Sequence, residues 1–173
     1  MMTLPSSPVF SLRVMRHVLV ALALMLAPVI GHAAEWDIDQ LMRGLAQIRS
    51  DHASFVEKKF IAMLDKPVES SGELFYTAPD HLEKRTIKPK PESMILDHGT
   101  LAGDRKALER NYRLSLDGTV EHWTLQLLPV DEKMQAVVKR IRIAGVRDAV
   151  RSIEITQADG DSSLMLIEKL ATP

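Results

Sequence analysis

The stretch EHWTLQLLP, residues 121–129, decides the fold of this protein. Its apolar residues Trp123, Leu125 and Leu127 alternate with polar ones. Successive side chains of a β-strand point to opposite faces, so this alternation predicts a strand in a sheet with one apolar and one polar face. Pro129 ends the strand because it has no N–H to donate to a ladder.

The same period of two residues recurs on both sides of this stretch. The segments that carry it are short and are bounded by Pro, Gly and Asp, which are typical of turns. Asp117-Gly118 and Asp159-Gly160 predict two hairpin turns. The connections are too short for helical crossovers between parallel strands, so we expect an antiparallel sheet. The predicted strands cover residues 52–63, 72–76, 82–87, 93–96, 112–116, 121–128, 140–146, 150–157 and 163–169.

Helical spacing appears in three places. Asp37 is a good N-cap for an amphipathic helix of about three turns that ends near Ile48. Thr100 is a possible N-cap for a helical insert that ends at residue 110, and residues 131–139 can form another helical turn. The predicted fold class is therefore α+β, mostly β, with a curved antiparallel sheet and helices against one of its faces.

The first 33 residues have the composition of a secretory signal peptide. A basic segment without acids precedes an apolar run over residues 18–30, and small residues follow. That run is too short to span a bilayer, which takes about 20 residues. We expect cleavage after Ala33, or after Ala34, and one domain over residues 34–173; an uncleaved N-terminal anchor is the alternative.

Composition excludes several kinds of chemistry. The chain has 22 Lys and Arg against 23 Asp and Glu, so it lacks the basic surplus of a nucleic-acid-binding protein. It has no Cys, and hence no disulfide or Cys nucleophile. No P-loop, G-x-S-x-G or H-E-x-x-H motif occurs, so we expect no cofactor and no metal. A Ser–His–Asp triad is recognised by geometry and stays open.

A single sheet with one apolar face and few helices leaves a concave apolar surface, which is typical of a ligand or partner site. The methionines after the leader suit an adaptable lining, although filling of the core is their more common role. They are Met42, Met63, Met94, Met134 and Met165.

Short motifs follow the leader in a fixed order. They are Leu41-x3-Leu45-Ala46-x-Ile48, Ala53-Ser54-Phe55-x-Glu57, Ser70-Ser71-Gly72-Glu73-Leu74, Ala78-Pro79, Thr86-x2-Pro89, Pro91-Glu92 and Trp123-x-Leu125-x-Leu127-x-Pro129. In this order, and with the final two-strand hairpin, they resemble the LolA-like outer-membrane lipoprotein carrier family. The resemblance covers essentially the whole chain after the leader.

The resemblance implies an unclosed half-barrel with helices as a lid over an apolar cavity. It implies a periplasmic, monomeric carrier, not an enzyme, that moves acylated cargo (a lipoprotein or another lipid) toward the outer membrane, with inner- and outer-membrane transfer proteins as partners. The expected lining comes from the helix and the sheet. The helix supplies Leu41, Leu45 and Ile48. Alternation along the strands, which fixes the inward face only if the register is right, adds Phe55, Leu74, Tyr76, Trp123, Leu125, Leu127, Ile143, Ile155 and Leu166.

Two features depart from the family pattern. The family's carriers place an Arg before the Pro that corresponds to Pro79, and this chain has Ala78 there; the connection over residues 97–99 is also short. The cargo is therefore open, and two alternatives remain. One is a lipid-responsive regulatory or adaptor protein, and the other is an enzyme on a carrier-like half-barrel, with His122 as the candidate group.

Overall fold

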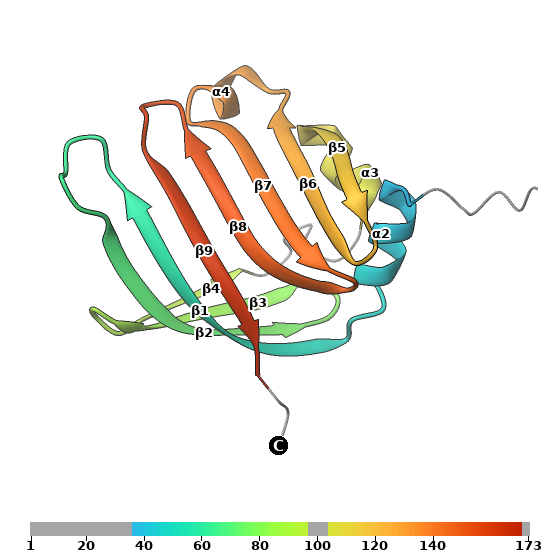
Figure 1. Cartoon of the computed structure of the whole chain (residues 1–173), viewed down its shortest axis with the longest axis horizontal. Coiled ribbons are helices and arrows are strands. Elements are labelled where there is room, and N and C mark those ends of the chain that lie inside the picture. The colour runs from blue at the N-terminus through green and yellow to red at the C-terminus, as the bar shows by residue number, and fades with distance from the viewer. Residues whose placement is uncertain (1–35, 97–103, 171–173) are drawn as a thin grey trace, which may run out of the picture. The chain divides into compact units, whose positions relative to one another are not determined.

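The computed structural model describes residues 36–96 and 104–170, and these form one antiparallel sheet. The sheet order is β4-β3-β2-β1-β9-β8-β7-β6-β5, so the first and last strands pair at its centre, while β4 and β5 form its edges. The curved sheet does not close into a barrel (Figure 1). The predicted mostly β, unclosed antiparallel fold is confirmed. The strands are β1 (Ser50–Phe60), β2 (Val68–Thr77), β3 (His81–Lys88), β4 (Glu92–Leu96), β5 (Tyr112–Thr119), β6 (His122–Pro129), β7 (Val138–Val146), β8 (Ala149–Gln157) and β9 (Ser162–Lys169).

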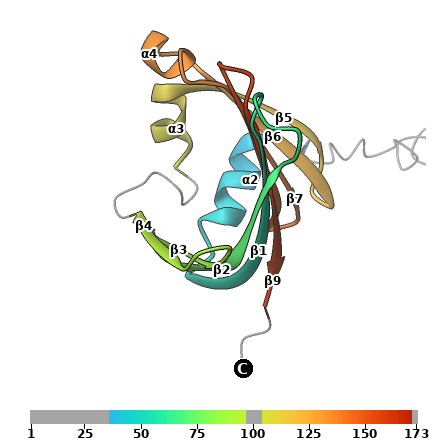
Figure 2. The same cartoon turned by 90° about the vertical axis from the view of Figure 1, so that its left-hand side faces the viewer.

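Helix α2 (Ile38–Leu45) begins where the sequence predicts it. The carboxylate of Asp37 accepts a hydrogen bond of 2.7 Å from the backbone N–H of Gln40, which satisfies one of the donors left open at a helix N-terminus. Leu41 and Met42 are buried. Figure 2 shows α2 on the concave side of the curved sheet.

Two short helices follow later in the chain. Helix α3 (Arg105–Asn111) has Asp104 as its N-cap, and the cap expected at Thr100 lies outside the described residues. Both residue types can cap a helix, and only the position of the first turn decides between them. Helix α4 (Glu132–Gln135) begins after Asp131, as predicted.

The hairpin between β5 and β6 turns later than expected. Strand β5 runs through Asp117 and Gly118, Thr119 pairs with His122, and the turn lies at residues 120–121. Gly118 has φ +98, and a Cβ there would lie 2.2 Å from the carbonyl oxygen of His122. The glycine is therefore required inside the strand, and the Asp-Gly pair misled the turn prediction.

The buried core lies between α2 and the apolar face of β6. Trp123, Leu125 and Leu127 pack with Leu41 and Met42, and none of the five side chains exceeds 4% exposure. The alternating stretch that predicted a strand thus supplies most of this core, and the core holds α2 against the sheet.

The leader over residues 1–33 and the connection over residues 97–99 also fall outside the described residues. Within residues 36–96 and 104–170, no helix has the length and apolar character needed to cross a membrane.

Candidate functional site

An apolar cavity of about 260 Å³ lies between α2, α3 and the concave face of the sheet. Side chains from both helices and from most of the strands converge on it, so it is built by the tertiary fold and not by one local motif. The lining residues are Met42, Leu45, Ile48, Asp51, Ala53, Leu74, Tyr76, Leu82, Leu108, Trp123, Leu125, Leu127, Ile143, Asp148, Val150, Ile153 and Ile167.

Strand register brings the lining together. Residues that face each other across two strands point to the same side of the sheet. Leu125 lies opposite Ile143, and Ala53 lies opposite Leu74, so each pair adds two neighbouring apolar side chains to one wall. The curvature of the sheet then turns these walls toward each other around α2 (Figure 2).

Many of the residues expected from the sequence line this cavity. They are Leu45, Ile48, Leu74, Tyr76, Trp123, Leu125, Leu127 and Ile143. Three others lie elsewhere on the inner side. Leu41 is enclosed in the core, Phe55 is buried under the ammonium group of Lys84, and Ile155 lies beyond the cavity on the face that it shares with Ile141.

Leu166 does not face inward, which corrects its expected role. It pairs with Val56, and these two side chains are exposed on the convex face, Leu166 at 54% and Val56 at 45%. The neighbouring Ile167 lines the cavity instead. Both residues are apolar, so alternation in β9 does not reveal which of them faces inward, and a shift of one residue inverts the face.

Sequence reasoning missed several lining residues. Val150 and Ile153 carry apolar side chains whose placement depends on register, whereas Ala53 is too small to suggest a lining role. Met42, considered from the sequence only among the methionines, also lines the cavity. Leu108 reaches the cavity from α3. Asp51, Asp148 and Leu82 could not be found from periodicity, because only the three-dimensional arrangement brings them to the cavity surface.

Trp123 forms part of the cavity wall in a fixed position. Its indole N–H donates a 2.8 Å hydrogen bond to the carbonyl oxygen of Arg147. A Cβ on Gly145, opposite Trp123 in β7, would lie 2.2 Å from indole atom Cζ2. The glycine thus lets the ring lie flat against the β7 backbone, which places its apolar surface at the cavity.

The polar groups of the lining are mostly engaged within the protein. The hydroxyl of Tyr76 donates to the carbonyl oxygen of Pro79 at 3.0 Å. Burial, and then the negative charge of Asp80, raises the pKa of the Tyr76 phenol above its ordinary value, so the phenol remains a neutral donor. Asp51 forms an ion pair of 3.2 Å with Lys169. Asp148 is exposed in the turn between β7 and β8.

An ion pair lies on the concave face next to the cavity. The ammonium nitrogen of Lys84 is 2.5 Å from a carboxylate oxygen of Glu57, and it lies 4.8 Å from the ring centroid of Phe55. Leu82, two residues before Lys84 in β3, lines the cavity. The ion pair therefore lies where the apolar lining ends and charged side chains begin.

The two helices that border the cavity are joined by one ion pair. Arg105 of α3 lies 2.9 Å from the carboxylate of Asp39 in α2 and 2.7 Å from Glu109 in its own helix. These contacts raise the pKa of the Arg105 guanidinium, so it stays charged. Exposed pairs of this kind contribute little stability.

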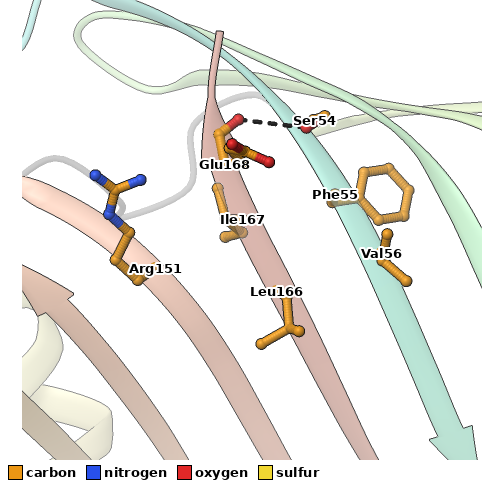
Figure 3. A pocket seen from close by; sticks show the side chains of 7 residues that line it. All are labelled: Ser54, Phe55, Val56, Arg151, Leu166, Ile167 and Glu168. Carbon is orange, nitrogen blue, oxygen red and sulfur yellow. Dashed lines mark hydrogen bonds between the residues drawn. The ribbon is translucent and has the colours of Figure 1, made fainter.

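A broader hollow lies on the opposite side, across β1, β9 and β8 (Figure 3). The hydroxyl of Ser54 donates to the carbonyl oxygen of Glu168 at 3.4 Å, and Arg151 stands at the β8 side. The exposed Val56 and Leu166 form much of its surface. Because its lining is largely solvated, this hollow shields an apolar ligand less well than the inner cavity does.

The groups considered for catalysis do not meet in the cavity. His122 is exposed at the start of β6 and does not line it. Among the described residues, no group of three or more His, Asp or Glu side chains is arranged to hold a metal ion. The cavity offers hydrophobic surface and two carboxylates, which suits binding.

Solved structures that are similar to this chain include the following three. A solved chain in the complex of MucA and MucB from Pseudomonas aeruginosa is similar at 14% identity with a TM-score of 0.50, covering 80% of this chain and 59% of that chain. A structure of MucB in complex with MucA(peri) gives 15% identity, a TM-score of 0.47 and coverage of 79% and 57%. A LolA superfamily protein from Nitrosomonas europaea gives 9% identity, a TM-score of 0.30 and coverage of 80% and 95%.

At 14% identity, the likeness to the solved chain in the MucA/MucB complex shows a shared fold and no more. This chain spans less than two thirds of the length of that chain and of the chain in the MucB–MucA(peri) complex. None of the curated proteins compared with the chain matches it. Residues 94–172 match the sequence model of the family described as outer membrane lipoprotein carrier protein LolA-like. This match, which begins within β4 and includes β5 to β9, confirms the resemblance to the LolA-like carrier family.

Proposed function

We propose that this protein is exported to the periplasm, where it binds the hydrocarbon part of an acylated molecule in the inner cavity and carries it toward the outer membrane. The observation that carries the proposal is the cavity of about 260 Å³ whose lining is apolar except for Asp51, Tyr76 and Asp148. The match of residues 94–172 to the LolA-like family supports the same function.

The physical basis of carriage is the transfer of hydrocarbon from water to an apolar wall. Each CH₂ group removed from water contributes about 0.8 kcal/mol. A hydrocarbon chain that the cavity encloses only in part gains only part of this free energy. Its binding is then strong enough for transport and weak enough for release. A cavity of limited size therefore fits a carrier better than a storage protein.

The first test is the ligand that the protein brings with it. Protein purified from the periplasm should release an acylated molecule on solvent extraction, detected by mass spectrometry, and its N-terminus should begin at Ala34 or at residue 35. Repeated recovery of ligand-free protein that also fails to bind added lipid would refute the carrier function.

The second test uses Trp123 as a reporter from within the cavity. The chain has two Trp residues, so Trp36→Phe leaves Trp123 as the only fluorophore of that type. A bromine-labelled acyl chain that enters the cavity should quench it. Leu82→Gln should weaken binding about tenfold, because it replaces much of an apolar contact worth about 1.5–3 kcal/mol.

Leu166→Gln is the matched control, since this leucine is exposed on the convex face. It should leave quenching unchanged. Equal loss in both variants, or quenching that Leu82→Gln does not alter, would refute this cavity as the lipid site.

An adaptor that binds a protein is the second candidate function. Among the described strands, β4 has only β3 as a neighbour, and its Met94, Ile95 and Leu96 side chains are exposed. An apolar edge strand can pair with an extended segment of another chain. The similar chain in the MucA/MucB complex supports it as well. A stable partner in pull-downs together with no lipid transfer between vesicles would favour this function over carriage.

A further inference from the structure

We propose that the cavity accepts a single hydrocarbon chain attached to a neutral or cationic head group, and that it discriminates against anionic lipids. This inference rests on the proposed carrier function and names the class of cargo. It follows from the size of the cavity and from the charges that surround it.

The size of the cavity limits the number of chains. Its volume of about 260 Å³ falls just below the range of roughly 300–1,000 Å³ that is typical of sites for drug-sized ligands. Within the described residues the helices restrict it from one side, because Met42 and Leu45 of α2 and Leu108 of α3 all reach its surface. One extended chain fits this space, whereas two or three chains packed side by side need a larger one.

The charged residues of the lining are both acidic. They are Asp51 and Asp148, and the lining contains no Lys, Arg or His. Lys169 neutralises Asp51 through the ion pair of 3.2 Å. The charge that is left over at the cavity is therefore that of Asp148.

Two basic groups near the cavity are already matched by carboxylates. Arg147, next to Asp148 in the chain, donates from Nε to Glu121 at 3.0 Å and forms an ion pair with the second oxygen of that carboxylate, also at 3.0 Å. Lys84 is held by Glu57. Arg49 is a further cation near Tyr76, but the negative charge of Asp80 outweighs it there, since Asp80 raises the pKa of the Tyr76 phenol more than Arg49 lowers it. An anionic head group would therefore meet a net negative field from Asp80 and Asp148 at the cavity.

The uncharged polar groups do not compensate for this field. The hydroxyl of Tyr76 donates to Pro79, and the indole N–H of Trp123 donates to Arg147. Neither donor is free to bind a phosphate or carboxylate. Asp148, in contrast, is exposed where the cavity wall meets solvent, so its carboxylate can accept hydrogen bonds from a hydroxyl or ammonium head group.

The test is a competition binding experiment on the full-length protein purified after its export to the periplasm. A fluorescent monoacylglycerol analogue serves as the neutral probe, and it is displaced by ligands that carry the same saturated chain: a monoacylglycerol, an alkyl trimethylammonium salt, the free fatty acid anion and a diacylglycerol. All are used below the concentrations at which they form micelles.

We expect the fatty acid anion to bind at least about fivefold more weakly than the monoacylglycerol and the cation, and this ratio to shrink at high salt. Asp148→Asn should reduce the ratio toward one. Asp117→Asn is the matched control, because Asp117 is exposed in β5 and does not line the cavity, so this variant changes net charge alone.

The outcomes separate the two proposals. If the neutral probe does not bind, the carrier function itself fails. If the probe binds but the anion competes as well as the monoacylglycerol, or Asp148→Asn leaves the ratio unchanged, the assignment of head-group charge is wrong while carriage stands. If the diacylglycerol binds more tightly than the single-chain ligand, the limit to one chain is wrong.

Discussion

Replacement of Gly145 by Ala should destabilise the protein through Trp123. The added Cβ would lie 2.2 Å and 2.6 Å from two atoms of the indole ring and 2.5 Å from the carbonyl oxygen of Ala149. The first two contacts come from a side chain that could move, but the third comes from backbone. The ring would have to leave its place, and its hydrogen bond of 2.8 Å to the Arg147 carbonyl would be lost.

The magnitude follows from the cost of overpacking. Extra carbon in a tightly packed site costs about 1–3 kcal/mol. For a domain of roughly this size, that corresponds to a melting temperature lower by about 3–10 °C. Differential scanning calorimetry on the full chain measures this shift directly, and the fluorescence spectrum of Trp123 reports whether the indole becomes more exposed to water.

Gly44→Ala is the control for the same chemical change. Gly44 lies in α2, and a Cβ there meets nothing within 4 Å. Alanine in a helix is favoured over glycine by about 0.5–1 kcal/mol, so this variant should melt at the same or a higher temperature. If Gly145→Ala melts as high as Gly44→Ala, the described packing of Trp123 against β7 is incorrect.

Two further predictions concern helix capping and pH. Asp37→Ala removes the acceptor for the backbone N–H of Gln40, so it should lower the free energy of unfolding, measured in urea, by about 0.5–2 kcal/mol. Asp37→Ser keeps a side-chain acceptor and should retain most of the stability. Equal stability of the two variants and the original protein would contradict the cap. The hydrogen bond from Arg147 holds the pKa of Glu121 below its ordinary value. The ionised carboxylate therefore stabilises the fold at pH values above the pKa of Glu121 in the unfolded protein. This contribution is lost as the pH falls through the lower pKa of the folded protein. Glu121→Gln should therefore lower the melting temperature near neutral pH, with a difference from the original protein that disappears in acid; a difference that persists at low pH would point to another cause.

The core and the candidate site share residues. Trp123, Leu125 and Leu127 are almost fully buried by α2 and its neighbours, yet the same side chains form part of the cavity wall. A charged residue at Leu125 would therefore affect folding and binding together, because a buried carboxylate without a partner is costly. Partly exposed lining residues such as Leu82 separate the two effects better.

Local sequence predicted much of the sheet because a strand in a two-faced sheet has a period of two. Strand β6 shows this most clearly, since its buried and partly buried residues alternate along the whole segment. The second hairpin was also predicted correctly: Gly160, with φ +98, lies in the connection between β8 and β9. Such features depend on neighbours in the chain, so the sequence reports them directly.

Features that depend on register were less predictable. Leu166 and Ile167 are adjacent and both apolar, and only the pairing of Leu166 with Val56 places one outside and the other in the cavity. Gly118 similarly belongs to β5 because its pairing with Trp123 places it inside the ladder. In both cases a partner distant in sequence decides the position.

The amino-acid order by itself determined the strands, the N-capped helix after Asp37, and the family likeness that the match over residues 94–172 bears out. Only the tertiary structure decided that the lining side chains enclose one cavity, that Ile167 and not Leu166 faces it, and that Asp51 and Asp148 are its charged residues. The physical reason is range: strand alternation and helix capping arise within a few residues, whereas the cavity arises from the curvature of the sheet and from pairing across it, which brings together residues as far apart in the chain as Asp51 and Asp148.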